Sequence, residues 1–180
     1  MKLKLVMPDE KYLSSVQEAI IEYRSEPSKF EINAVRKMII AQQNNFAEYF
    51  KNTQNEALGL NLRPGYVAHT IFWLIDNDNY IGTFNLRPNL TPALEQIGGH
   101  IAYQIRPSKQ RKGYAYAGLK LCLDEAHKIG IKKVLITCEI ENVASYSVMH
   151  KAMLEFGGYE DKMFMKDNHA EKRVWIRTDK

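Results

Sequence analysis

The sequence predicts one folded domain of the α/β class that spans residues 1–180. Its 180 residues are enough for one sizeable core and too few for two ordinary domains. Hydrophobic residues make up 45% and charged residues 26% of the chain, a composition that excludes collagen-like, coiled-coil and disordered proteins. Segments with helical spacing of apolar residues alternate with segments rich in β-branched and aromatic residues, so helices and strands are both expected.

The first part of the chain predicts a short strand followed by two helices. Residues 3–7 alternate weakly in polarity and indicate the strand. Asp9 is a candidate cap for the first helix, whose apolar residues recur every three or four positions over 13–23. A second helix is expected over residues 33–50, with Asn33 as its cap, before a polar run breaks the pattern.

A strand meander is expected next. Residues 66–75 and 80–86 are rich in aromatic and β-branched side chains, and the polar run 76–79 between them predicts a hairpin. After a loop, residues 97–105 predict a third strand that Pro107 ends.

The second half predicts a helix, a buried strand, a helix and two closing strands. Residues 115–129 carry the clearest helical stripe, and Gly130 is expected to end it. The remaining elements are expected as a strand at 134–138, a helix at 142–156, and strands at 159–165 and 173–177 joined by a turn at 166–168.

The composition argues against membrane, metal and nucleic-acid partners. No apolar stretch approaches the length of a membrane span, and residues 1–10 lack a signal-peptide core, so the protein is expected to be cytoplasmic. Cys122 and Cys138 have no partners at zinc spacing and are expected to be reduced core residues, with no metal. The net charge of +4 is modest, and the basic cluster 106–112 lacks the interleaved aromatics of a nucleic-acid platform.

The segment 97–129 contains a candidate anion site. An apolar strand leads through a basic loop into a helix, whose start offers unpaired N–H groups and the positive end of the helix dipole. Gly113 would let a phosphate approach the backbone, so a diphosphate fits this environment. The surrounding basic residues are Arg106, Lys109, Arg111 and Lys112, with no nearby acid. The alternative is that the glycine only eases a tight turn and the charges form a solvated face.

These residues resemble a known family. The run Gln110, Arg111, Lys112, Gly113, Tyr114, Ala115 matches the Q/R-x-x-G-x-G/A signature of the GCN5-related N-acetyltransferases. Residues 98–108 resemble a bacterial branch of uncharacterised acetyltransferases in that superfamily, and residues 97–158 carry the specific part of the resemblance. The family fold implies a mixed, mostly antiparallel sheet with a splayed parallel strand pair, flanked by helices on both faces.

The resemblance implies acetyl-CoA as the cosubstrate and no metal. Its diphosphate would lie on the backbone of residues 110–115, and its pantetheine would lie between strands 97–105 and 134–138. The main chain of Ile105 would contact the thioester end and could stabilise the oxyanion. Asn142 and Ser145 resemble the N-x-x-S/A element that contacts the cofactor arm, while a simple helix cap at Asn142 is an alternative that does not exclude that contact.

The resemblance implies transfer of the acetyl group to a primary amine by direct attack in a ternary complex. The general acid is usually a tyrosine, but Met149 stands at that position, and Met153 does so in a second alignment. Tyr146 is the nearest substitute, although it also lies on an apolar helical stripe that is typical of core. Gly99 stands where relatives place a glutamate as general base, and Glu95 ranks first as its replacement because it precedes the splayed strand. The other candidate bases are His100, Glu139 and Glu141.

The function expected is therefore an N-acetyltransferase that acts on a small-molecule or protein amine. The absence of the usual tyrosine leaves a second interpretation open, a domain of the same fold that binds or senses acyl-CoA without turnover. A small basic nucleic-acid binder is the weakest interpretation. The resemblance also allows a homodimer.

Overall fold

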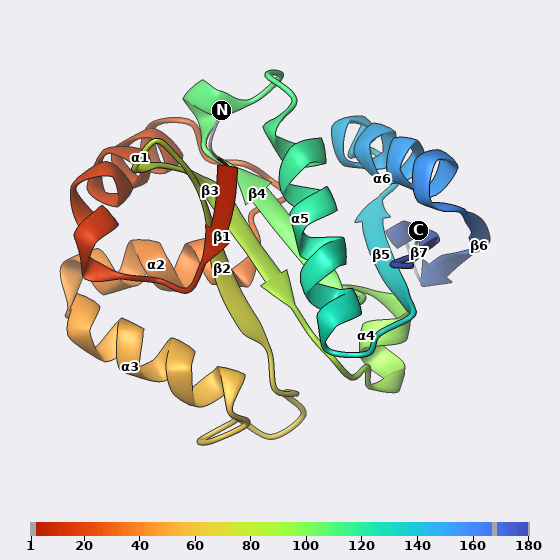
Figure 1. Ribbon diagram of the computed structural model, residues 1–180, viewed down its shortest axis with the longest axis horizontal. Coiled ribbons are helices and arrows are strands. Elements are labelled where there is room, and N and C mark those ends of the chain that lie inside the picture. The colour runs from red at the N-terminus through yellow and green to blue at the C-terminus, as the bar shows by residue number, and fades with distance from the viewer. Residues whose placement is uncertain (1–2, 167–168, 180) are drawn as a thin grey trace.

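The chain forms two antiparallel sheets with helices around them in the computed structural model, which describes residues 3–166 and 169–179 (Figure 1). The first sheet pairs, in order, β1 (Leu3–Val6), β2 (Thr70–Asp76), β3 (Asn79–Leu86) and β4 (Ile101–Ile105). The second has the order β5 (Lys133–Glu139), β7 (His169–Arg177), β6 (Gly158–Lys166). The predicted α/β class is confirmed, with the sheet divided in two.

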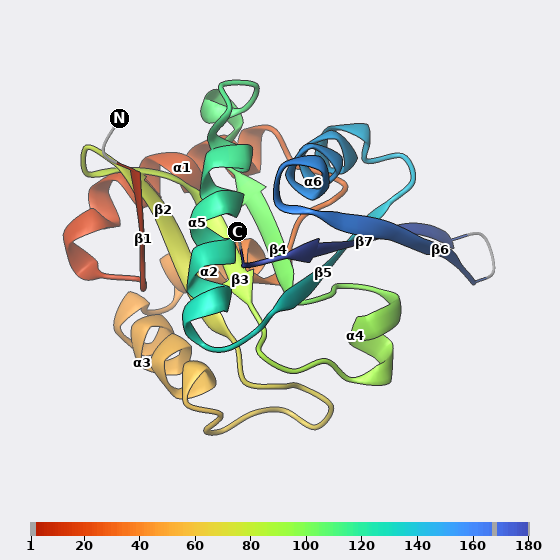
Figure 2. The same cartoon turned by 45° about the vertical axis from the view of Figure 1, so that its right-hand side comes forward.

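Helices cover both faces of the first sheet. The α-helices are α1 (Leu13–Ser25), α2 (Asn33–Gln43), α3 (Phe46–Ala57), α4 (Pro92–Gln96), α5 (Tyr114–Lys128) and α6 (Val143–Phe156), and short 3₁₀ turns occupy η1 (Glu10–Tyr12) and η2 (Pro107–Lys109). Figure 2 shows α5 in front of β1–β4 and α1 and α2 behind them, and the packing contacts agree. α6 packs on the second sheet. None of the described helices combines the length and apolar character that a membrane span requires.

The two sheets meet at one end of β4 and then separate. The backbone N–H of His100 donates to the carbonyl of Leu135 at 2.7 Å, and the Leu135 N–H donates to the His100 side chain Nδ1 at 2.9 Å. No ladder joins β4 to β5 beyond this point. The splayed strand pair that the resemblance implies is therefore β4 and β5, and a cleft opens between them.

The core lies in two clusters on opposite faces of the first sheet. One is built from α1, α2, α3 and the inner faces of β2 and β3, around Trp73 and Tyr80. The other joins α5 and α6 to both sheets, around Phe84 and Leu119. Gly118 allows α5 to approach closely, since a Cβ there would lie 2.4 Å from the Phe84 ring.

Several predicted boundaries are wrong, and local chemistry explains most of them. The helix predicted over 33–50 is two helices, because the Asn45 side chain caps α3 by accepting the Ala47 N–H at 2.8 Å. The strand predicted from residue 66 begins at Thr70, because its partner β3 ends opposite it at Leu86.

The other differences lie near β4 and in β7. The expected loop before β4 contains α4, which Thr91 caps and Pro92 begins. Residues 97–100 are not strand, because Gly98 and Gly99 have φ of 109° and 59°, which a strand cannot continue. β7 begins at residue 169 rather than 173, because its pairing with β5 extends to Glu171 and its pairing with β6 extends to His169. Residues 167 and 168 of the expected turn lie outside the described residues.

Candidate active site

The start of α5 is an open anion site built from backbone. Gly113 is the N-cap residue, with φ of 81° in the left-handed region, and no side chain caps the helix. Arg111 also has a positive φ of 58°. Among the described residues, the N–H groups of residues 111–116 have no hydrogen-bond partner. Consecutive free N–H groups at the positive end of a helix bind phosphate oxygens well.

The signature side chains hold this loop in place. Gln110 Nε2 donates to the carbonyl of Ile105 at 3.2 Å, which ties the loop to the end of β4. The Tyr114 hydroxyl donates to Asp76 at 2.9 Å, and Lys112 Nζ donates to the Ser108 carbonyl at 2.8 Å. Ala115 presents only a methyl group beside the free N–H groups. The backbone of the loop is therefore left available while the side chains of Gln110, Lys112 and Tyr114 contact the protein.

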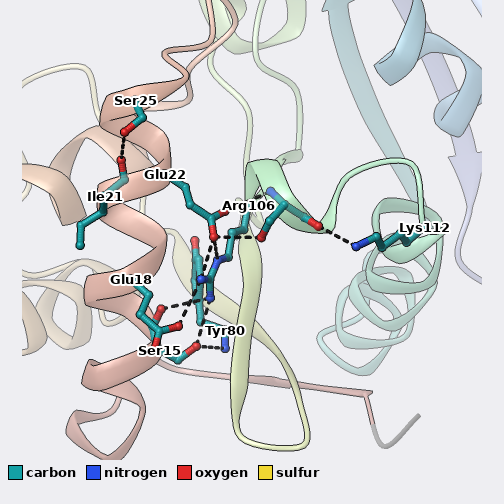
Figure 3. Close-up of polar contacts among 9 residues, drawn as sticks. Ser15, Glu18, Ile21, Glu22, Ser25, Tyr80, Arg106 and Lys112 are labelled. Carbon is teal, nitrogen blue, oxygen red and sulfur yellow. Dashed lines mark hydrogen bonds and ion pairs between the residues drawn. The ribbon is translucent and has the colours of Figure 1, made fainter.

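Arg106 does not belong to the anion site, so that expectation is wrong (Figure 3). Its guanidinium is buried and donates to Glu22 at 2.8 Å and to Glu18 at 3.2 Å on α1. Glu22 also accepts the N–H and the hydroxyl of Ser108. Burial alone would raise the pKa of Glu22, but the bonds from Arg106 and Ser108 lower it overall. The expectation of no nearby acid is wrong as well, because both carboxylates contact Arg106. They come from a distant part of the chain, so the local sequence does not show them.

The cleft between β4 and β5 has a volume of about 220 Å³. It is lined by residues of β4 and β5, the head of α6 and the α1–α2 loop. Backbone bonds to β3 flank β4 at both ends: the Arg106 N–H donates to the Ile81 carbonyl, and the His100 carbonyl accepts the Arg87 N–H. Because backbone groups alternate between the two edges of a strand, the even-numbered residues of β4 bond to β3. Ile105 consequently turns its N–H and carbonyl toward β5, which does not pair with it.

Asn142 and Ser145 lie together at the head of α6 and line the cleft. Asn142 Oδ1 accepts the Ser145 N–H at 3.1 Å, so Asn142 caps the helix, as the alternative interpretation expected. Its amide nitrogen has no hydrogen-bond partner among the described residues, so capping leaves it free to contact a ligand. Cys138 also lines the cleft rather than only filling core, and burial raises the pKa of its thiol to about 11.

Tyr103 is the tyrosine that the structure places in the cleft. Its hydroxyl lies 3.1 Å from Ser145 Oγ, and its ring stacks on Phe84 at 5.4 Å between centroids. Burial raises the pKa of Tyr103 above its ordinary value, so it keeps its proton at neutral pH. From the sequence, Tyr103 is only one residue of the strand predicted over 97–105. A tyrosine on the inner face of a splayed strand was the available signal.

Tyr146 and Glu95, the residues predicted to be the acid and the base, do not line the cleft. The Tyr146 hydroxyl donates to Glu160, a bond that raises the pKa of Tyr146, and its ring lies under Lys172 Nζ at 3.5 Å. Glu95 is exposed on α4. The structure therefore does not bring these two side chains together.

The other candidate bases have different surroundings. His100 is buried and bonded to Leu135, and burial together with the nearby Arg87 guanidinium lowers the pKa of His100 to about 4. Glu141 pairs with Lys29 at the cleft mouth, and Glu139 lines the cleft. Among the described residues, no group of three or more His, Cys, Asp or Glu side chains is placed to hold a metal ion.

Comparison with known protein families supports an assignment. The family model of the acetyltransferase (GNAT) domain matches residues 16–154, a span that contains the open helix start and both walls of the cleft. The class of protein is therefore that of an acetyltransferase. The chain belongs to the GNAT acetyltransferase family.

Solved structures share the fold at low sequence identity. RimL, a ribosomal α-N-protein acetyltransferase in complex with coenzyme A, gives a TM-score of 0.66 at 16% identity, over 99% of this chain and 96% of that one. The microcin C7 self-immunity acetyltransferase, in complex with acetyl-CoA and AMP, gives 0.65 at 14% identity, over 97% and 92%. At these identities the likeness shows the fold alone.

A curated relative matches part of the chain. The uncharacterized N-acetyltransferase YnaD of Bacillus subtilis (strain 168) is 32% identical over 69 residues. The match covers 38% of this chain and 41% of the relative, so the chain spans about two fifths of that protein's length.

Proposed function

We propose that this protein is an acetyl-CoA-dependent N-acetyltransferase that transfers the acetyl group to a primary amine by direct attack in a ternary complex. The observation that carries the proposal is the row of free N–H groups of residues 111–116, which follow β4, one of the two splayed strands that enclose the cleft. Two solved structures of this fold hold coenzyme A or acetyl-CoA. The acceptor is a small-molecule or protein amine, and residues 1–180 act as one domain.

The residues present fit this cosubstrate. The backbone of Gln110, Arg111, Lys112, Gly113, Tyr114 and Ala115 would hold the diphosphate, because its N–H groups from residue 111 onward are free and it offers no carboxylate, whereas the Gln110 N–H donates to Pro107. Asn142 and Ser145 would contact the arm in the cleft. When bound, acetyl-CoA supplies the activated thioester. The N–H of Ile105, on the edge of β4 that faces β5, would stabilise the negative charge that develops on the thioester oxygen.

The proton donor is the second part of the proposal. Tyr146 as acid and Glu95 as base remain the proposals drawn from the sequence. The geometry favours Tyr103 as the acid, because its hydroxyl lies in the cleft beside Ser145 and keeps its proton. A thioester is already activated, so holding both substrates together supplies part of the acceleration without a strong base.

The test is calorimetric titration of acetyl-CoA into the wild type and two matched variants. Gly113→Glu puts a carboxylate in the phosphate site, and we expect acetyl-CoA binding to be lost. Gly130→Glu is the control, because Gly130 ends the same helix with a φ of 84°, and a Cβ added at Gly130 or at Gly113 would meet no atom within 4 Å. Both variants therefore carry the same backbone strain. Equal affinity of the two variants for acetyl-CoA would refute the phosphate site. Parallel titrations with desulfo-CoA and ATP measure how specific the site is for coenzyme A.

A module that binds acyl-CoA without turnover is the second candidate. It is favoured by the position of Tyr146, whose hydroxyl bonds to Glu160 outside the cleft. Release of coenzyme A with an amine panel decides between the candidates. Turnover above the rate of thioester hydrolysis excludes the second candidate.

A further inference from the structure

A second cavity, of about 440 Å³, lies beside the cleft. It is enclosed by the start of α2, the loop before β2, the end of β3 and α4, and Ile97 lines both the cavity and the cleft. Apolar residues such as Val67, Leu94 and Phe164 form part of its wall. No Asp or Glu is among the described residues that line it.

Arg87 brings an unneutralised positive charge to this cavity. Its Nη1 donates to the carbonyls of Gly98 and Gly99 at 3.3 and 3.1 Å. Its Nε and Nη2 have no partner, and no carboxylate pairs with it, among residues 3–166 and 169–179. The other basic groups in the lining, Lys37 and His69, both contact Glu56, at 2.6 and 3.3 Å. Arg87 is therefore the charge that a ligand would balance.

Asn85 provides a second, independent polar group. It lines the cavity next to Arg87, the residue is 5% exposed, and its Oδ1 has no hydrogen-bond partner among the described residues. Buried amides in proteins are normally bonded, so this unpaired oxygen in a residue of the cavity wall is a polar group that the described residues leave unsatisfied. The start of α2 adds free N–H groups at Asn33 and Ala34, since no side chain caps that helix.

We propose that this cavity binds a carboxylate carried by the acceptor amine, which makes the acceptor a molecule of the amino-acid class. This inference rests on the proposed function. A planar guanidinium with two free donor nitrogens matches a carboxylate, and its single charge balances a monoanion. A phosphate dianion would remain half neutralised. Because Ile97 lines both the cavity and the cleft, a ligand held by Arg87 lies next to the cleft that Tyr103 also lines.

Binding of matched small probes to the full chain tests the proposal in the presence of saturating acetyl-CoA. The probes are 3-phenylpropionate, the neutral 3-phenylpropan-1-ol and inorganic phosphate, each measured by calorimetry. We expect the carboxylate to bind at least tenfold more tightly than the alcohol, and phosphate more weakly than the carboxylate. Equal affinity for the acid and the alcohol, or tighter binding of phosphate, would overturn the carboxylate assignment.

Three variants separate this site from the rest of the protein. Asn85→Asp adds a negative charge at nearly constant shape, and we expect carboxylate affinity to fall at least tenfold while acetyl-CoA affinity is unchanged. Arg87→Gln should lose the preference for the carboxylate over the alcohol. If Arg87→Gln does not fold, Asn85→Asp still tests the proposal. Arg36→Gln removes an exposed charge of α2 outside the cavity and should change carboxylate affinity less than twofold. Unchanged carboxylate affinity in Asn85→Asp would overturn the proposal, whereas loss of acetyl-CoA binding in the wild type would overturn the proposed function.

Discussion

The Tyr103 hydroxyl should act as the proton donor to the departing thiolate. It lines the cleft, contacts Ser145 Oγ at 3.1 Å and is protonated because burial raises its pKa. We expect Tyr103→Phe to lower kcat about a hundredfold, the ordinary contribution of acid catalysis. Acetyl-CoA affinity should not change, since the ring and its stacking on Phe84 are kept. Steady-state release of coenzyme A and calorimetry together measure both quantities.

Tyr146→Phe is the matched control for that prediction. It removes the same atom from a tyrosine whose hydroxyl bonds to Glu160 outside the cleft, so kcat should fall less than twofold. A large fall in kcat in Tyr146→Phe, with no fall in Tyr103→Phe, would restore Tyr146 as the general acid, as the sequence predicted. Glu95→Gln tests the proposed base in the same assay.

Cys138 should react slowly with oxidised coenzyme A at neutral pH. Burial, and secondarily the Glu171 carboxylate, raises the pKa of its thiol to about 11. The thiolate is the reactive form, so the rate should rise about tenfold with each pH unit between pH 7 and 10. Mass spectrometry of the intact protein follows the adduct. Cys138→Ala should remove the adduct and Cys122→Ala should keep it, because Cys122 is fully buried outside the cleft. A rate independent of pH would contradict this account.

At the scale of elements, the joint between β4 and β5 depends on His100. The side chain accepts the Leu135 N–H, so deleting it leaves a buried donor without a partner. We expect His100→Ala to lower the free energy of unfolding by about 2 kcal/mol, the ordinary cost of an unpaired buried donor. His100→Asn should restore most of this stability, because its Oδ1 can accept the same bond. Urea unfolding at pH 7 measures both variants.

The same histidine should make stability depend on pH. Burial, then the Arg87 guanidinium, lowers the pKa of His100 from 6.5 to about 4. Between these values the unfolded chain binds a proton that the folded chain does not, so stability is complete above pH 6.5 and falls as the pH drops toward 4. The full loss in the free energy of unfolding is about 3 kcal/mol. His100→Asn should remove this slope, and an unchanged slope would contradict the assignment.

The prediction of elements from the sequence succeeded where periodicity is long. The stripe of α5 and the buried run of β5 were found because each pattern spans the whole element. Short capped elements were missed, since α4 depends on Thr91 and Pro92 within what reads as a polar loop. The break at Asn45 was missed because apolar spacing continues across it while a side-chain cap interrupts the backbone.

At the scale of the whole molecule, the anion site was predictable and the rest of the cleft was not. The start of α5 is a local feature, and one short run of sequence contains it. Arg106 reads as part of that basic run, but its partner Glu22 lies 84 residues away and neutralises it. Tyr103 and Ser145 are 42 residues apart and meet only through the splay of the two strands. Contacts between distant segments depend on tertiary packing, which spacing along the chain does not report.

Acetyl-CoA should bridge the two halves of the molecule. The two sheets meet beside His100, and the proposed cosubstrate would run from the start of α5 through the gap between β4 and β5. Hydrogen exchange should therefore slow in three segments from different parts of the chain, 103–105, 111–116 and 138–145. The second segment should exchange fast without ligand, because its N–H groups are free.

The exchange pattern distinguishes binding of the whole cosubstrate in the cleft from binding of its diphosphate alone. Ligand at a hundredfold excess over its Kd should also raise the unfolding free energy by about 2.7 kcal/mol, because it binds only the folded chain. Gly113→Glu should show neither effect, whereas Gly130→Glu should show both. Protection confined to 111–116 would mean that the diphosphate binds while the pantetheine stays outside the cleft. The chain would then hold coenzyme A by its diphosphate end only. That result would contradict acetyl transfer with Tyr103 as the proton donor.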